Sequence, residues 1–247
     1  MKRALRVSAV AVGLSVLILA AEVVLAVNRR YQPTSPALDL DATFGPAGGE
    51  PLRFVVLGDS TGAGVGAGDA GHAFPTLLAE RLAAGGRRVD LRVFAVSGAR
   101  VRDVLIDQVP RAVAVHPDLV FVAIGGNDAT HVTGLNRLRA DMGAALDDLV
   151  ATGATVVVSG PGAMNTPNFL PPLRQLIGWR GRSVEAAIER AARDRDLATV
   201  ELRERTAMLF TDDPETFFSD DDFHPGPAGY AAWADAIGPV LERALQA

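Results

Sequence analysis

The pattern of apolar and polar residues divides most of the chain into short apolar runs and longer amphipathic stretches. From residue 53 onward, five apolar runs of strand length predict β-strands at 53–57, 89–96, 119–124, 155–159 and 198–202. Between and after them, apolar residues recur at helical spacing. These stretches predict helices at 73–84, 101–115, 135–152, 173–196 and 227–245, with Pro110 kinking or ending the second.

Regular alternation of strands and helices is typical of a parallel sheet with helices on both faces. The five runs are almost wholly apolar, as expected when both faces of a sheet are covered. We therefore predict an α/β fold, with three α/β/α layers and a parallel sheet of about five strands. In such sheets the functional residues lie just beyond the carboxyl ends of the strands.

The N-terminus has a different pattern. Residues 7–27 are apolar apart from Ser8, Gly13, Ser15 and Glu22, and basic residues flank them on both sides. A membrane-spanning helix needs roughly 20 such residues, whereas the core of a signal peptide is shorter and ends near small residues. A signal-anchor, a signal peptide cut after Ala26 and a buried core helix are all open.

The basic residues before the run favour a cytoplasmic N-terminus and a domain outside the membrane, either anchored by a single pass or secreted. Residues 1–30 are thus predicted to be the anchor or signal segment. Residues 31–52, rich in Pro, Gly, Ala and Asp, are predicted to be a linker, and residues 53–247 the folded domain.

Composition narrows the choice of function. Of 247 residues, 49% are hydrophobic, so the chain is not a disordered one. No cysteine is present, which excludes disulfides, thiol nucleophiles and Cys-ligated zinc. The first 30 residues carry a net charge of +4, which leaves −9 for the rest of a chain whose total is −5. A nucleic-acid partner is therefore not expected, because it requires a basic face.

Four polar clusters follow predicted strands or precede the last helix. They are Gly58-Asp59-Ser60, Ser97-Gly98-Ala99, Gly125-Gly126-Asn127-Asp128 and Asp220-Asp221-Asp222-Phe223-His224. A serine hydroxyl is a weak nucleophile until a base takes its proton, and His224 is the histidine expected at the same edge of the sheet. Asp221 lies three residues before it and can orient the imidazole, although Asp220 and Asp222 are close alternatives.

The second and third clusters offer hydrogen-bond donors. Gly98 presents an unshielded backbone N–H and Asn127 a side-chain amide. Together with the N–H of Ser60 they would form a three-donor oxyanion hole. The Gly-x-Ser-x-Gly elbow of α/β-hydrolases also fits residues 58–62, but in that fold the nucleophile follows several strands and the acid lies far from the histidine in sequence.

These four clusters resemble, in order and spacing, the four motif blocks of the SGNH (GDSL-type) hydrolase family. The resemblance covers about residues 53–247, and Leu170–Arg174 is also similar to small bacterial esterases of this group. It implies a flavodoxin-like three-layer fold, no metal or cofactor, and ester hydrolysis through an acyl-enzyme. The family spans lipases, lysophospholipases, arylesterases, thioesterases and carbohydrate deacetylases.

From the residues and the resemblance together we expect a serine esterase. Ser60 would be the nucleophile, with Asp221 and His224 completing the triad and a small lipid, aryl or acetylated-carbohydrate ester as substrate. An acyltransferase acting on a cell-envelope sugar or lipid would have the same site, and a non-catalytic binding module is the rival of another class. Phe169, Leu170, Leu173, Leu176 and Trp179 would form either an apolar lip of the site or ordinary helix packing.

Overall fold

The computed structural model describes residues 2–34 and 37–247, and the side chains of residues 13–34 and 37–247. Its centre is a six-stranded sheet with the order β1-β3-β2-β4-β5-β6. β1 pairs antiparallel with β3, and all other neighbours are parallel. The strands are β1 (Ala42–Phe44), β2 (Glu50–Gly58), β3 (Arg87–Val93), β4 (Leu119–Ala123), β5 (Thr155–Ser159) and β6 (Ala198–Val200).

Successive residues of the central strands enter two separate cores, because side chains alternate between the faces of a sheet. In β2, Phe54 and Val56 belong to one core, and Val55 and Leu57 to the other. Burial on both faces explains why these strands read as unbroken apolar runs.

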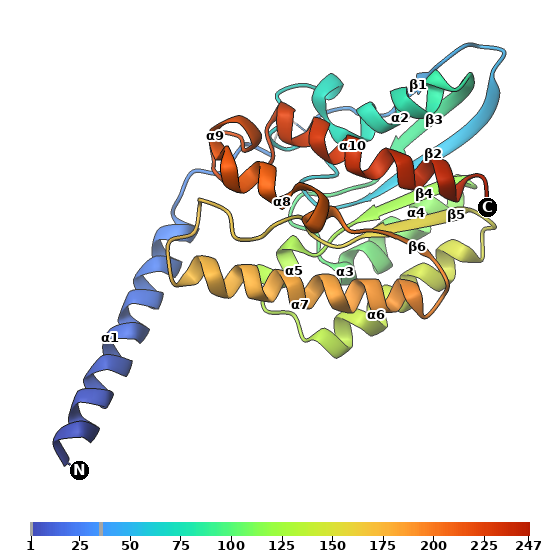
Figure 1. Cartoon of the computed structure of the whole chain (residues 1–247). Helices are drawn as coiled ribbons and strands as arrows, with labels where there is room; N and C mark the ends of the chain where they lie inside the picture. The colour runs from blue at the N-terminus through green and yellow to red at the C-terminus, as the bar shows by residue number, and fades with distance from the viewer. Residues whose placement is uncertain (1, 35–36) are drawn as a thin grey trace.

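Helices cover the two faces and complete three layers (Figure 1). One face packs against α2 (Phe74–Ala84) and α10 (Pro227–Ala244), with α8 (Leu202–Asp212) beside them. The other face packs against α4 (Val109–Ala114), α6 (Leu135–Val150) and α7 (Leu173–Arg193). Shorter helices lie in the connections: α3 (Val101–Asp103), a π-helical turn (Val104–Gln108), α5 (Gly126–Thr130) and α9 (Pro214–Phe217).

The order of the parallel strands is that of flavodoxin-like folds. After β2 the chain passes to β3 on one side and then crosses back to β4 on the other. This reversal opens a crevice at the carboxyl ends of β2 and β4, where ligands bind in such sheets. Ser60 follows β2 and Asn127 follows β4, so the topology brings two of the predicted clusters to this crevice.

The structure corrects the predicted elements in three places. The sheet has six strands rather than about five, because the predicted linker 31–52 contributes β1 and the first residues of β2. Leu40 of the same segment is 4% exposed and belongs to the core below α2. The single helix predicted at 101–115 is divided by the π-helical turn, and α4 begins one residue before Pro110, where proline is tolerated. Finally, α5, α8 and α9 were not predicted.

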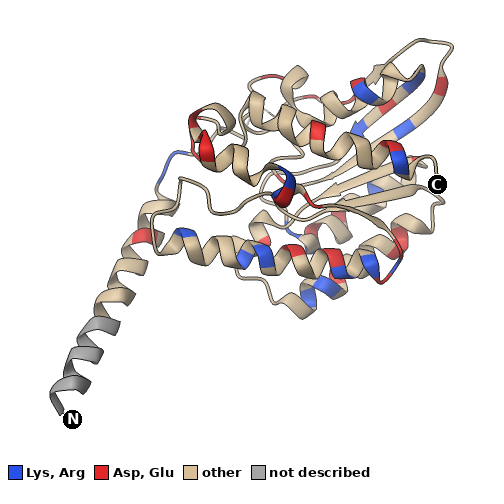
Figure 2. Cartoon of the chain, viewed as in Figure 1, with Lys and Arg blue, Asp and Glu red and all other residues tan. Residues whose placement is uncertain are grey.

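The N-terminal helix α1 (Lys2–Val27) projects from the body of the molecule and meets it at its C-terminal end (Figure 1). Figure 2 shows charged residues spread over the outer helices, whereas residues 13–27 of α1, whose side chains are described, carry only Glu22, near the end that meets the domain.

Within the part of the chain whose side chains are described, no helix is both long enough and apolar enough to span a bilayer. The predicted membrane anchor therefore has no support in the structure, although that prediction also rests on residues 1–12, whose side chains lie outside the described part.

Candidate active site

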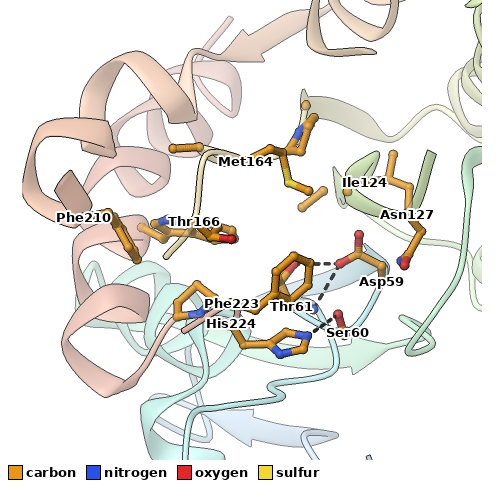
Figure 3. Close-up of a pocket in the computed structure, with 18 of the residues that line it drawn as sticks. Asp59, Ser60, Thr61, Ile124, Asn127, Met164, Thr166, Phe210, Phe223 and His224 are labelled. Atoms are coloured by element: carbon orange, nitrogen blue, oxygen red, sulfur yellow. Dashed lines mark hydrogen bonds between the residues drawn. The ribbon is translucent and has the colours of Figure 1, made fainter. Parts of the chain in front are cut away.

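The structure brings Ser60, His224 and Asp221 into one hydrogen-bonded line. Figure 3 shows the contact between Ser60 and His224. Ser60 Oγ lies 2.9 Å from His224 Nε2, and Asp221 Oδ2 lies 2.7 Å from His224 Nδ1. All three residues are buried, with 5–8% of their surface exposed. This is the arrangement in which a histidine can take a proton from a serine while a carboxylate fixes its tautomer.

The Asp221 carboxylate is held on both oxygens. Its Oδ1 accepts hydrogen bonds from Ser219 Oγ and from the N–H groups of Phe223 and His224, at 2.8–3.0 Å. Its Oδ2 accepts from the N–H of Gln32 at 2.9 Å as well as from His224. Burial alone would raise the pKa of Asp221, but these hydrogen bonds outweigh it and hold the pKa well below its usual range.

The alternatives Asp220 and Asp222 are both exposed. Asp222 has a left-handed backbone (φ 58°), a conformation that Asp tolerates better than most residues. The resulting turn directs the carboxylate of Asp221 back toward the N–H and imidazole of His224. The local backbone geometry thus places Asp221, and neither of its two acidic neighbours, against His224.

Two contacts fix the loop that carries Ser60, one with the π-helical turn and one with the histidine loop. The side chain of Gln108 donates to Gly58 O at 2.8 Å and accepts from Gly58 N at 2.9 Å, which secures the end of β2 just before Ser60. Gly66, after the serine, has a φ of 92°, and a Cβ there would lie 2.5 Å from Pro225 O and 3.1 Å from His224 Cβ. A side chain at 66 would therefore push the two loops apart.

Gly98 and Asn127 lie on adjoining segments at the same end of the sheet. The turn that contains Gly98 is joined to β2 by a hydrogen bond from Val96 N to Gly58 O, and to α5 by one from Asn127 Nδ2 to Ala99 O at 3.0 Å. Gly98 has a φ of 84°, and no heavy atom lies within 4 Å of the position a Cβ would take. Figure 3 shows Asn127 lining the same cavity as Ser60.

Two further buried carboxylates flank this region. Burial raises the pKa of Asp59, and the hydrogen bonds that its Oδ1 accepts from Thr61 N–H and hydroxyl oppose this without cancelling it. Burial likewise raises the pKa of Asp128, which accepts a hydrogen bond from Val101 N at 3.0 Å. Asp59 lines the cavity, whereas Asp128 links α5 to the start of α3.

The cavity beside Ser60 is mostly apolar. Its larger apolar side chains are Ile124 just after β4, Met164 after β5, Phe210 of α8, Trp233 of α10, and Phe218 and Phe223 from the connection between α9 and α10. The five residues considered for an apolar lip do not line it. Phe169 and Leu173 pack instead against Ala26 of α1, and Leu170, Leu176 and Trp179 are exposed.

Sequence reasoning missed three residues that hold this site. Gln108 secures Gly58, and Gln32 N–H reaches Asp221. Asn168, which is 1% exposed, donates from Nδ2 to Asp221 O at 2.9 Å. Each acts through a contact 50 or more residues distant in sequence, so no local spacing marks them. The one available signal is helical spacing, which places Gln108 on the same face of the predicted helix as Val101 and Val104.

A comparison with protein families identifies the family of this chain. Residues 56–232 match the model of the GDSL-like Lipase/Acylhydrolase family. The chain belongs to this family. The match begins within β2 and ends within α10, so it spans the region that carries Ser60, Gly98, Asn127, Asp221 and His224.

One relative that matches most of this chain is also named as GDSL-like. The GDSL-like esterase Rv1075c of Mycobacterium tuberculosis is 31% identical over 198 residues, which cover 78% of this chain and 63% of that protein. The chain thus spans less than two thirds of the length of this relative.

Solved structures share the fold. TesA superposes with a TM-score of 0.65 at 23% identity, covering 78% of this chain and 99% of TesA. The acetylxylan esterase Axe2 of Geobacillus stearothermophilus, solved as a catalytic mutant, gives a TM-score of 0.62 at 18% identity, covering 80% and 95% of the two chains. At these identities the likeness establishes the three-layer fold.

Proposed function

We propose that this protein is a serine esterase that hydrolyses carboxylic esters through an acyl-enzyme on Ser60. The observation that carries the proposal is the line from Ser60 Oγ through His224 to Asp221 Oδ2, with contacts of 2.9 and 2.7 Å, at the wall of an apolar cavity. Membership of the GDSL-like family and the name of the mycobacterial relative support the same activity.

In the first half-reaction, Ser60 Oγ attacks the ester carbonyl carbon while His224 Nε2 accepts the hydroxyl proton. The carbonyl oxygen becomes an oxyanion, which the N–H groups of Ser60 and Gly98 and the Asn127 amide stabilise. Asp221 keeps the Nδ1–H of His224 in place and stabilises the imidazolium. Collapse of the tetrahedral intermediate breaks the bond to the alkoxy oxygen, which leaves as the alcohol with the proton from His224.

In the second half-reaction, His224 takes a proton from water, and the resulting nucleophile attacks the acyl carbon on Ser60. The same donors stabilise the second oxyanion. The C–O bond to Ser60 then breaks, Ser60 recovers its proton from His224, and the carboxylic acid is released. No step draws on a metal or a cofactor.

The lining of the cavity favours esters with an apolar acyl or aryl group. The aromatic rings of Phe210, Phe218, Phe223 and Trp233 and the thioether of Met164 offer contacts to hydrocarbon and few hydrogen-bond partners. Within the lipid, aryl and acetylated-carbohydrate esters, we therefore favour the first two.

Hydrolysis of p-nitrophenyl esters of increasing acyl length tests this proposal. The wild type should hydrolyse them, and Ser60→Ala should reduce kcat at least 10³-fold. A fluorophosphonate should add to Ser60, as located by peptide mass spectrometry. Ser183→Ala, on the surface of α7, is the matched serine control and should retain both activity and labelling. Full activity in Ser60→Ala, or labelling at another serine, would refute the proposal.

A further inference from the structure

The residues just after α1 contact the acid of the proposed triad directly. The backbone N–H of Gln32 donates to Asp221 Oδ2 at 2.9 Å, and the same oxygen accepts the hydrogen bond from His224 Nδ1 at 2.7 Å. A carboxylate oxygen has two lone-pair positions, and these two donors occupy both of them. The donor from residue 32 belongs to a segment that the sequence predicted to be a linker.

A second contact reaches the same loop through aromatic rings. The ring of Tyr31 meets Phe223 edge-on, with centroids 5.6 Å apart and planes at 86°. Phe223 in turn meets the imidazole of His224 edge-on at 5.0 Å and 89°. Phe223 also lines the cavity beside Ser60, so Tyr31 supports a wall of the proposed substrate pocket from behind.

The hydroxyl of Tyr31 joins the hydrogen bonds that support this loop. It lies 3.0 Å from Ala26 O and 3.3 Å from Asn168 Oδ1. Asn168 Nδ2 donates to Asp221 O, and Asn168 N donates to Asp222 O at 3.1 Å. The segment after α1 therefore supports the acid loop both directly and through Asn168.

The C-terminal end of α1 fixes this segment to the domain. Glu22, which is 7% exposed, accepts a hydrogen bond from Leu173 N at 2.9 Å, at the start of α7. The N-cap of α7 is Pro172, which has no side chain able to cap, so Glu22 supplies the missing acceptor and places a negative charge at the positive end of a 21-residue helix. Ala26 packs beside it against Phe169 and Leu173.

We propose that residues 22–32 are an N-terminal brace that positions the triad acid, with the N–H of Gln32 as the group that holds Asp221 against His224. This inference rests on the proposed esterase function. It means that residues 53–247 contain the triad but not every group that positions the triad acid. The side chain of Asp221 is only 2% exposed, so water cannot easily replace a donor lost from residue 32.

Proline at position 32 removes the single donor, because proline has no backbone N–H. Gln32→Ala keeps the N–H and is the matched control. In the full-length protein with p-nitrophenyl acetate, kcat of Gln32→Ala should exceed kcat of Gln32→Pro by about tenfold, the effect of one hydrogen bond to a charged group. KM should agree within about twofold, because the N–H of residue 32 contacts the triad acid and residue 32 does not line the cavity beside Ser60. The rate of fluorophosphonate labelling of Ser60 should fall in parallel with kcat.

Equal kcat values in two folded variants would overturn the proposal, and so would a loss confined to KM. If Gln32→Pro does not fold, as judged by circular dichroism, Glu22→Ala takes its place. It undocks the brace from α7 and should lower kcat about threefold. Its control is Val23→Ala, an exposed neighbour. Equal kcat in that pair would also overturn the proposal.

Failure of the brace proposal can be distinguished from failure of the proposed esterase function. If Ser60→Ala remains active, the esterase mechanism itself is wrong. If Ser60→Ala is inactive and the paired variants at positions 32 and 22 are equally active, only the brace is wrong.

Discussion

At the scale of single residues, the acid loop shows how a local turn selects one carboxylate among three. Asp221 accepts hydrogen bonds on both oxygens, whereas Asp222 lies 3.9 Å from Arg29 in an exposed ion pair and Asp220 is exposed. Exposed ion pairs contribute little to stability. The three residues therefore differ far more in their surroundings than in their chemistry.

This difference predicts the outcome of three matched amide substitutions. Asp221→Asn removes the charge that stabilises the imidazolium and should lower kcat at least about 10-fold. Asp222→Asn keeps a residue that tolerates the left-handed backbone, and Asp220→Asn changes an exposed side chain, so both should stay near the wild type. A damaging Asp220→Asn or Asp222→Asn beside a harmless Asp221→Asn would contradict the assignment.

Asn127 is expected to act in the transition state. Its amide N already donates one hydrogen to Ala99 O at 3.0 Å, which orients the group while leaving its second hydrogen for an oxyanion. Asn127→Ala should lower kcat about 10²–10³-fold with little change in KM. Steady-state kinetics measure both constants, and an effect confined to KM would make Asn127 a substrate-binding residue instead.

Asp59 should make stability depend on pH. Burial raises its pKa in the folded protein, so the folded state binds this proton more tightly than the unfolded chain does. The wild type then loses stability as the pH rises above the ordinary carboxyl range of about 4. Asp59→Asn retains an acceptor for Thr61 and avoids this loss. Its Tm should exceed that of the wild type at pH 7, and the difference should shrink toward pH 4, as measured by thermal unfolding. A lower Tm at pH 7 would show that the charge of Asp59 is stabilised in the fold.

At the scale of elements, the helices and strands that could be predicted are those marked by a pattern of nearby residues in the sequence. Strands β2, β4 and β5 follow from apolar runs buried on both faces, and the helices of the outer layers from their helical spacing. β3 buries only Val89 and Leu91, on one face, and its signature is the alternation of apolar and polar residues. The spacing of Asp221 and His224 is visible for the same reason, since one turn joins them. By contrast, α5, α8 and α9 are short or weakly periodic, and β1 is a three-residue strand that forms only because β3 offers it an edge.

The π-helical turn is an element whose purpose appears only in three dimensions. It places Gln108, 1% exposed, against both backbone groups of Gly58, where it acts like a short piece of neighbouring strand. Gln108→Leu would leave Gly58 N without its partner in a buried site. Unfolding in urea should show a loss of about 1–3 kcal/mol, the cost of an unpaired buried group. Asp107→Asn, at the exposed neighbouring position, should be neutral, and equal stability of the two variants would contradict this role.

At the scale of the whole molecule, sequence and structure differ most over where the folded unit begins. The predicted boundary at residue 53 followed from the composition of 31–52, because Pro, Gly and Asp rarely form regular structure. The structure instead places Leu40 in the core, pairs β1 with β3, and joins Gln32 to Asp221. Each of these contacts joins residues far apart in sequence, so composition alone could not reveal them.

The position of Leu40 provides a direct test of this larger unit. A Cβ on Gly64 would lie 3.6 Å from a Leu40 methyl group, so Leu40 packs beside the loop that follows Ser60. Truncation of a buried leucine leaves a cavity and costs about 2–5 kcal/mol. Leu40→Ala should therefore lower the free energy of unfolding by about that amount in a single cooperative transition. Leu170→Ala is the matched control, because that leucine is 40% exposed and its loss should cost less than about 0.5 kcal/mol. If residues 31–52 were only a linker, Leu40→Ala would cost as little as Leu170→Ala. Equal free energies of unfolding for the two variants would therefore support the predicted domain boundary at residue 53.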